Sequence, residues 1–329
     1  MDFNGKTILI TGGAGFIGSN LAHYFQKNYP DAKVVVFDIF RTGERFDNGN
    51  LKSFGHFENL QGFRGEIVAG DLNSKEDLDR LKEFKFDYIF HQAAISDTTV
   101  ADQNIMLRTN LNAFKDILEL AKRDKASLVY ASSGATYGNA PAPQRVGVES
   151  PANIYGFSKL AMDNLAYEWI KREDFPIVGL RYFNVYGPRE YYKNKTASMV
   201  LQFGLQILSG KNPKLFEGSD KIFRDFIYIE DIIQANIKAT NPKRSGVYNV
   251  GTGVARSFQD IVDILGVELG VDFECEYIPN PYIGQYQFFT QADIEPTREF
   301  LDYEPKFSLE DGIKAYTPEI VKIFKTKKS

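Results

Sequence analysis

The sequence contains few of the residues that build disulfides or metal sites. Its 329 residues include one cysteine, Cys275, and three histidines, His23, His56 and His91. A single cysteine excludes an internal disulfide, and the spacing of the histidines offers no metal cluster. We therefore expect no bound metal and a reducing, cytoplasmic location.

Long apolar runs and a strong excess of one charge are also missing. No stretch is long enough to span a bilayer, and the opening "MDFNGK" leads directly into a strand without a hydrophobic leader. Lys and Arg number 39 against 43 Asp and Glu, a formal charge of -4, which supplies no basic surface for nucleic acid. We expect a soluble, unexported chain whose partner is a small molecule, neither a membrane nor a nucleic acid.

Short β-rich runs alternate with helical segments through the first half of the chain. The runs are almost continuously Val, Ile, Leu and Phe, as in parallel strands that are buried on both faces. Strands are predicted at 6–11, 33–38, 66–71, 86–91, 126–133 and 176–183, and helices at 16–28, 74–84, 103–124 and 153–173. Asn153 is placed to cap the last of these helices. The alternation predicts an α/β fold with a doubly wound parallel sheet.

After residue 184 the pattern is looser. We expect helices at 197–209, 230–240, 257–269 and 309–325, and a strand at "GVYNVG". Segment 39–64 has no clear period. A smaller mixed α/β lobe is therefore predicted after the sheet domain.

Three glycines follow the first strand and open the first helix. In "ILITGGAGFIGSN" they are Gly12, Gly15 and Gly18. Glycine in such a turn permits a tight backbone path and a close approach to a pyrophosphate, with the helix N-terminus facing the negative charge. The strand, turn and helix together predict a dinucleotide-binding Rossmann domain.

Charged residues near the second strand bear on which dinucleotide is bound. Asp38 ends that strand and could accept a hydrogen bond from a ribose hydroxyl, which favours NAD. Arg41, Arg45 and Lys52 follow, and cations there could hold the 2′-phosphate of NADP or could simply be solvated. These residues leave NAD and NADP open. Asp71, after the third strand, could bond an adenine amino group or start a turn.

A tyrosine and a lysine four residues apart begin the helix at 153–173. Tyr155 and Lys159 lie on one helical face. A tyrosine has an ordinary pKa of about 10, and we expect a nearby ammonium group and a nicotinamide cation to lower it. Tyr155 would then be a general acid and base. Ser133 comes at the end of the fifth strand, where open α/β sheets bind ligands.

Several motifs together resemble the extended short-chain dehydrogenase/reductases. They are "TGGAGFIGS", "HQAA", "YASSGATYG", "YGFSK", "RYFNVYGP" and "RDFIYIEDI", in that order. The resemblance implies that Ser133 and Tyr155 contact the sugar hydroxyl that is oxidised, and that Lys159 holds the nicotinamide ribose. Hexose 4,6-dehydratases have Thr-Asp-Glu where this chain has Ser132, Ser133 and Gly134, which argues against dehydration.

A narrower resemblance is to the ADP-glycero-manno-heptose 6-epimerases. It is carried by "RYFNVYGPREYYKNKTASMV", "PKLFEGSDKIFRDF" and "YQFFTQADI". It implies that Lys193 is a second acid and base opposite Tyr155 and also contacts the cofactor. It further implies a tightly bound NADP, with Arg45 as the partner of its 2′-phosphate.

The same resemblance implies further contacts. On the cofactor side they include Phe16, Ile17, Ile39, Gln92, Ala93, Ala94, Ile95, Ser96, Asn110 and Val185. For ADP-heptose they are Asn184, Lys195, Gln202, Phe216, Glu217, Gly218, Ser219, Arg224 and Tyr286. Other members have serine and histidine in place of Lys195 and Gln202.

The hypothesis is an NADP-dependent epimerase that inverts C6 of ADP-D-glycero-β-D-manno-heptose for lipopolysaccharide synthesis. Residues 1–184 would form the NADP-binding domain, to which the chain returns near 226–250, and 185–329 mainly the substrate lobe. The resemblance implies a homo-oligomer, a pentamer. Alternatives are a UDP- or GDP-hexose 4-epimerase, a sugar-nucleotide reductase, and a non-catalytic NADP-sensing protein.

Overall fold

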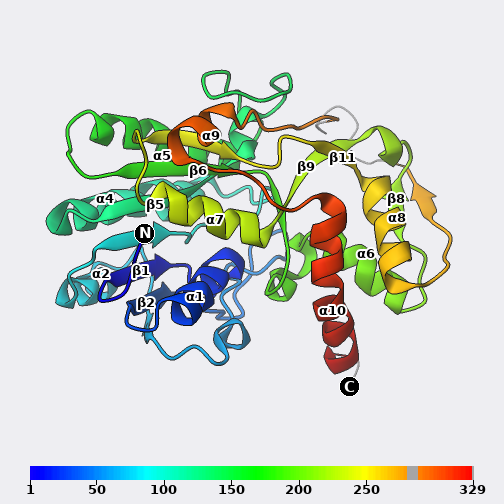
Figure 1. Ribbon diagram of the computed structural model, residues 1–329, viewed down its shortest axis with the longest axis horizontal. Helices are drawn as coiled ribbons and strands as arrows, with labels where there is room; N and C mark the ends of the chain where they lie inside the picture. Colours follow the sequence, from blue (N-terminus) through cyan, green and yellow to red (C-terminus); the bar gives the residue numbers. More distant parts are fainter. Residues whose placement is uncertain (280–287, 328–329) are drawn as a thin grey trace.

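A seven-stranded parallel sheet forms the centre of the molecule (Figure 1). The computed structural model describes residues 1–279 and 288–327. The sheet order is β10-β6-β5-β4-β1-β2-β3. The strands are β1 (Thr7–Thr11), β2 (Lys33–Asp38), β3 (Glu66–Ala69), β4 (Tyr88–His91), β5 (Ser127–Ser133), β6 (Ile177–Tyr182) and β10 (Gly246–Val250). The predicted Rossmann-type doubly wound sheet is confirmed.

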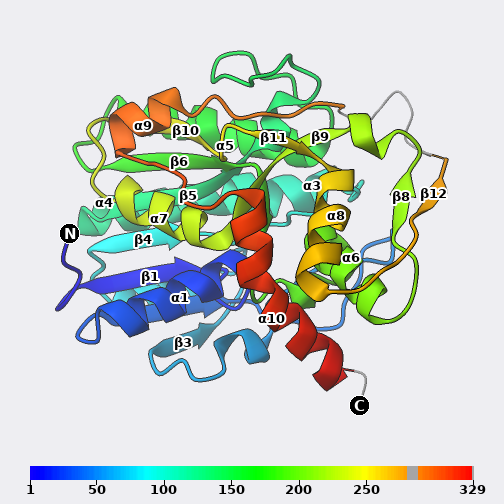
Figure 2. The same ribbon diagram turned by 45° about the vertical axis from the view of Figure 1, so that its right-hand side comes forward.

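Helices cover both faces of this sheet, as its apolar strands require. Ile8 and Ile10 of β1 pack with α1 (Phe16–Asn28) and α7 (Ile229–Ala239), whereas Leu9 points to the other face. That second face carries α4 (Ala113–Asp124) and α5 (Ile154–Ile170). Figure 2 shows α1 and α7 on the same side of the sheet. Burial on both faces explains why the strands lack polar alternation.

The register brings the ends of neighbouring strands to one level. Thr11 at the end of β1 is paired with Phe37 of β2 and with His91 of β4. Ser133 of β5 is paired with Tyr182 of β6. The residues that follow these strand ends therefore meet along one edge of the sheet.

The helices of the first half follow the prediction with two differences. Asn153 caps α5, since its side-chain oxygen accepts from the Gly156 N–H at 2.8 Å. The helix expected at 74–84 ends early, as α2 (Lys75–Arg80) and a 3-10 turn (Leu81–Glu83). The one expected at 103–124 is interrupted, because a π-helical turn (Arg108–Asn112) separates α3 (Gln103–Leu107) from α4.

The second lobe combines three packed helices with two small sheets. Its helices are α6 (Met199–Leu208), α8 (Phe258–Leu269) and α10 (Leu309–Lys327). The three-stranded sheet has the order β11-β9-β7 and the other sheet pairs β12 with β8. These strands are β7 (Asn184–Tyr186), β8 (Lys214–Phe216), β9 (Phe223–Tyr228), β11 (Ala255–Ser257) and β12 (Glu276–Ile278). The start of "NVYGPREYYKNKTAS" reads as a strand running into a turn, and β7 lies there. The other four were not predicted, because β8, β11 and β12 are three residues long and β9 is buried almost throughout, so none of them shows alternation.

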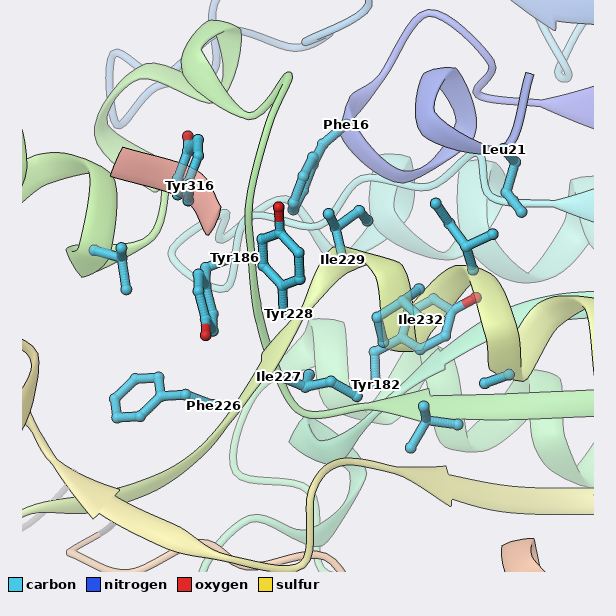
Figure 3. Close-up of a cluster of buried hydrophobic side chains, with 14 of the residues drawn as sticks. Phe16, Leu21, Tyr182, Tyr186, Phe226, Ile227, Tyr228, Ile229, Ile232 and Tyr316 are labelled. Atoms are coloured by element: carbon cyan, nitrogen blue, oxygen red, sulfur yellow. The ribbon is translucent and has the colours of Figure 1, made fainter. Parts of the chain in front are cut away.

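Parts of the second half of the chain lie on the central sheet. Strand β10 extends the sheet beside β6, and α9 (Glu295–Leu301) packs near β10. Figure 3 shows part of the buried cluster between the lobes, with Phe16 from α1, Tyr228 from β9 and Tyr316 from α10. The two lobes therefore share a continuous apolar core.

Segment 39–64 is mostly irregular, in keeping with its lack of period. It contains one 3-10 turn (Phe57–Leu60) and an isolated bridge between Arg45 and Leu51. Within the described ranges, no helix has the length and apolar character needed to cross a bilayer.

Candidate active site

A cleft of about 760 Å³ runs along the carboxyl ends of the sheet strands. One wall comes from residues that follow β1, β2, β4 and β5, and the other from the second lobe. Predicted site residues that line it are Gly12, Gly15, Phe16, Ile17, Gly18, Asp38, Ile39, Asp71, Gln92, Ala93, Ala94, Ile95, Ser96, Ser133, Tyr155, Lys159, Asn184, Val185, Lys193 and Arg224. The fold thus collects side chains that lie more than 200 positions apart in the chain into one cavity.

The glycine turn leaves room for a phosphate group at the start of α1. Gly12 has φ +67°, and a Cβ there would come within 2.7 Å of the Ala93 nitrogen. A Cβ on Gly18 would lie 2.3 Å from the Gly12 carbonyl oxygen. Gly15 precedes α1 and provides no capping side chain, so the first N–H groups of the helix can bind an anion. This turn fits the pyrophosphate of a dinucleotide.

Asp38 lines the cleft and also holds the glycine turn in place. Its carboxylate accepts hydrogen bonds from the Ala14 N–H at 2.9 Å and the Phe40 N–H at 2.7 Å. Burial raises the pKa of this carboxyl group, and these backbone donors oppose the change. Two backbone donors therefore already use part of the acceptor capacity predicted for a ribose hydroxyl.

The three cations after β2 point in different directions. Arg45 does not line the cleft, and its Nη1 donates to the Gly49 carbonyl at 2.7 Å. The Arg41 Nη2 donates to the Tyr192 carbonyl. Lys52 lines the cleft and pairs with Glu44 at 3.1 Å. Of these three cations, Lys52 is the one that lines the cleft.

Asn110 supports the cofactor wall without reaching the cleft. Its side chain is fully buried and bonds both backbone groups of Ile95, accepting from the N–H at 2.8 Å and donating to the carbonyl at 3.0 Å. It also donates to the Ser158 hydroxyl at 3.0 Å. Ile95 and Ser96 line the cleft whereas Asn110 does not, so the hydrogen bonds of Asn110 support the backbone of this wall.

Ser133, Tyr155 and Lys159 lie together at the end of β5 and the start of α5. The Lys159 amine donates to the Ala131 carbonyl at 2.7 Å, and burial lowers the pKa of Lys159 to about 8. Burial also raises the pKa of Tyr155, with a hydrogen bond to Ser133 opposing the change. The expectation that the neighbouring ammonium group lowers the pKa of Tyr155 is not met by the protein alone, since burial outweighs the hydrogen bond to Ser133.

A buried charged network lies behind this group. Asp163 on α5 accepts from the Tyr130 hydroxyl and the Ser132 hydroxyl, each at 2.9 Å, and pairs with Arg181 at 2.9 Å. Its negative charge raises the pKa of Lys159 and so opposes the effect of burial. The network holds β5 against α5 and so fixes Ser133 relative to Tyr155.

Lys193 lies on the wall that the second lobe contributes. It belongs to a 3-10 segment (Tyr191–Thr196), is half-buried, and has its amine 5.5 Å from the centre of the Phe16 ring. Burial lowers the pKa of Lys193, and the charge of Glu190 opposes this change. Desolvation thus favours the neutral amine that proton transfer by this residue requires.

Most of the other predicted substrate contacts do not line the cleft. Lys195 is exposed, and Gln202 donates to the carbonyls of Ala197 and Lys195 at 2.7 and 3.3 Å. Neither lines the cleft, nor do the four residues at the end of β8 and its turn, which are Phe216, Glu217, Gly218 and Ser219. Tyr286 lies outside the described residues. The predicted contacts of Lys195 and Gln202 were the ones at which this chain departs from other family members.

Several residues that line the cleft were not predicted. Among them are Ser53, Asn73, Arg108, Thr196 and Thr290. Thr290 is 7% exposed, and its hydroxyl has no hydrogen-bond partner among the described residues, so a ligand group in the cleft could satisfy it. The one available signal was its place in "YQFFTQADI", which carried the family resemblance.

Comparison with known proteins agrees with this geometry. Residues 8–251 match the family described as "NAD dependent epimerase/dehydratase family". The chain is 54% identical to ADP-L-glycero-D-manno-heptose-6-epimerase from Helicobacter pylori, with a TM-score of 0.89 and 97% of each chain covered.

Two more distant solved structures have the same fold. UDP-glucose 4-epimerase from Thermotoga maritima is 27% identical, with a TM-score of 0.84 over 96% of this chain and 99% of that one. UDP-glucuronic acid 4-epimerase from Bacillus cereus, solved with UDP-glucuronic acid and NAD, is also 27% identical, with a TM-score of 0.81 over the same shares. The resemblance found in the sequence is confirmed, and the non-catalytic alternative is set aside: the chain belongs to the NAD-dependent epimerase/dehydratase family and is an epimerase within it.

Proposed function

We propose that this enzyme uses NADP to invert C6 of ADP-D-glycero-β-D-manno-heptose, giving the L-glycero form. The observation that carries the proposal is that two ionisable side chains, Tyr155 and Lys193, line one cleft but come from different lobes. The 54% identity to the Helicobacter pylori heptose epimerase supports the same substrate.

Inversion at a side-chain carbon gives a reason for two such groups. The dinucleotide, when bound, supplies the hydride acceptor and donor for transient oxidation of C6 to a ketone. Rotation about the C5–C6 bond then moves the oxygen away from the group that took the first proton. Tyr155, held by Ser133, would exchange the proton on one side and Lys193 on the other.

The residues that line the cleft would form one group that binds the cofactor and another that binds the sugar nucleotide. Gly12, Gly15 and the N-terminus of α1 would hold the pyrophosphate of the cofactor. Lys159 would hold the nicotinamide ribose through its amine. Lys52 lines the same cleft as Asp38 and joins Arg45 as a candidate partner for the 2′-phosphate of NADP.

Arg224 is the candidate partner for the substrate pyrophosphate. Arg224 is 8% exposed and lines the same cleft as Asn184 and Thr290. A guanidinium group can bind two phosphate oxygens at once. The product would serve lipopolysaccharide synthesis in the cytoplasm, and we expect a homo-oligomer, with a pentamer the form to test by light scattering.

The decisive test has two parts. The nucleotide released on denaturing the purified protein should carry a 2′-phosphate. The folded, cofactor-loaded protein should convert ADP-D-glycero-β-D-manno-heptose to its C6 epimer, followed by NMR. No conversion of this sugar, together with turnover of a UDP- or GDP-hexose at C4, would replace the proposal with the 4-epimerase alternative.

Lys193→Met tests the second proton-transfer group. Because Met keeps the apolar stem and removes the amine, we expect the variant to keep its cofactor and lose at least about 100-fold in kcat. Lys211→Met, at an exposed lysine away from the cleft, is the matched control and should retain turnover. Near-normal kcat in Lys193→Met would remove Lys193 from the mechanism.

A further inference from the structure

Glu190 is a fully buried carboxylate three residues before Lys193. Its Oε1 accepts from the Gly187 N–H at 3.2 Å and from the Ser198 hydroxyl at 2.7 Å. Its Oε2 accepts from the Ser198 N–H at 2.6 Å. A single side chain therefore ties together the two ends of the segment 187–198, which carries Lys193.

The backbone of this segment turns around Glu190. The Lys193 N–H donates to the Glu190 carbonyl at 2.9 Å, and the Thr196 hydroxyl donates to the Lys193 carbonyl at 2.9 Å. Asn194 interrupts the helical path with φ 53° and ψ -122°. Since a non-glycine residue with positive φ is uncommon, the surrounding contacts must hold the turn in this shape.

Two charged groups of this segment, the Glu190 carboxylate and the Lys193 amine, influence each other. Burial raises the pKa of Glu190, while the positive charge of Lys193 lowers it. Tyr316 on α10 is a titratable group that interacts with the same carboxylate, whose charge contributes to the raised pKa of Tyr316. The neighbouring Arg189 is directed elsewhere, with its Nη1 donating to Asn20 on α1 at 3.1 Å.

We propose that Glu190 is a positioning residue for Lys193, one that holds the lysine-bearing turn by both ends and keeps a carboxylate within electrostatic range of the amine. The inference rests on the role that the proposed function gives to Lys193. It gives a reason for a carboxylate in a fully buried position, where an unpaired charge is costly.

The charge of Glu190 determines the direction in which this residue changes the pKa of Lys193. A nearby negative charge favours the protonated amine, so its removal lowers the pKa of Lys193 further. The lysine would then lose its proton at a lower pH. This holds whether Lys193 acts as the acid or as the base in a given direction of the reaction.

Two variants separate charge from structure. Glu190→Gln removes the charge and keeps the length of the side chain. Ser198→Ala removes one donor to Glu190 and keeps the charge. Competitive acetylation of the cofactor-loaded protein with a small anhydride, read by mass spectrometry across pH, follows the amine of Lys193 directly, with exposed Lys211 as the reference for reagent strength.

We expect the labelling midpoint of Lys193 to fall by about one pH unit in Glu190→Gln, and to stay at the wild-type value in Ser198→Ala. The part of the kcat–pH profile that reports the titration of Lys193 should also shift to lower pH in Glu190→Gln and stay unchanged in Ser198→Ala. A fall in stability with no movement of the midpoint or of this part of the profile would show that Glu190 is merely structural, and would overturn the proposal.

These readouts also separate this inference from the proposed function. Failure of the wild-type enzyme to convert ADP-heptose would end the proposed function, yet the labelling midpoint would still report on Glu190. If Glu190→Gln does not fold, Glu190→Asp keeps the charge and shortens the reach. Its turnover should fall while the midpoint stays within about half a unit, and full turnover would overturn the positioning role.

Discussion

Lys193 and Lys195 lie two positions apart on one short segment, and they have different surroundings. Lys193 is half-buried on the cleft wall beside Phe16, whereas Lys195 is exposed and away from the cleft. Sequence alone could distinguish them only through the resemblance, because both have the same side chain and nearly the same neighbours. Burial of one amine lowers the pKa of that lysine, which suits it to the proton transfer that we propose.

Tyr155 is the residue whose hydroxyl the proposed chemistry needs first. Tyr155→Phe keeps the ring that packs at the start of α5 and removes the proton-transfer group, so we expect kcat to fall about 100- to 10,000-fold with the cofactor retained. Tyr277→Phe, at a tyrosine that is 52% exposed, is the control and should keep its activity. Steady-state kinetics and nucleotide content of both variants check this, and more than a tenth of wild-type kcat in Tyr155→Phe would contradict it.

His91 connects the site to acid stability. It is buried between Thr11 and Phe114, and burial lowers its pKa from 6.5 to about 3, with Lys159 adding to the effect. Below pH 6.5 the unfolded chain binds a proton that the folded protein does not, so His91 makes the free energy of unfolding fall as the pH falls. The contribution is up to about 1.4 kcal/mol per pH unit.

His91→Asn removes this titration, and the measurement is denaturant unfolding of both proteins between pH 8 and pH 4. We expect the difference between their unfolding free energies to shift in favour of the variant below about pH 6.5. A difference that stays constant over the whole range would show that His91 titrates normally in the folded protein.

At the scale of elements, the turn between β1 and α1 was predictable because its requirements are local. A strand, a tight turn and a helix N-terminus follow one another, and glycine is needed where Gly18 approaches the Gly12 carbonyl. The helix at 103–124 was predicted as continuous, yet it contains the π-helical turn around Asn110. That interruption depends on Asn110 reaching Ile95, a contact between elements that periodicity does not record.

Gly18→Ala tests the turn. The added methyl group would lie 2.3 Å from the Gly12 carbonyl oxygen, so the turn must move away from its phosphate-binding shape. We expect loss of the bound dinucleotide and a fall of about 1–3 kcal/mol in the free energy of unfolding. Gly266→Ala in α8, where the nearest atom is a Phe273 ring carbon at 3.1 Å, is the control, and equal loss of nucleotide in both would contradict the prediction.

On the scale of the whole molecule, three distant parts of the chain meet at Tyr192, next to Lys193. Its ring stacks on His56 at 3.6 Å between centroids, and its carbonyl accepts from Arg41. Its hydroxyl accepts from Lys327 of α10 at 3.1 Å, an amine that also bonds Glu58 at 3.2 Å. The cofactor-side segment 39–64, the Lys193 segment and the C-terminal helix are thereby joined.

Tyr192→Ala should therefore affect both ligands. Loss of the stacked ring should lower the free energy of unfolding by about 1–2 kcal/mol, weaken retention of the dinucleotide and reduce kcat, because segment 39–64 and Lys193 lose a common support. The measurements are denaturant unfolding, nucleotide content and turnover, with Tyr277→Ala as the exposed control. Full nucleotide content and turnover in Tyr192→Ala would show that the contacts of Tyr192 support neither the bound dinucleotide nor Lys193.

The sequence by itself determined the parallel sheet, the glycine turn and the pairing of Tyr155 with Lys159. These features depend on neighbours a few residues apart, whose periodicity is visible in the chain. The tertiary structure decided which cation after β2 lines the cleft, and that Lys193 is partly buried there whereas Lys195 is exposed. It also decided that Glu190 and Asn110 support backbone next to the cleft without lining it themselves. Such features depend on burial and on contacts between segments that lie far apart in the chain. Both arise only once the two lobes have packed around their common core.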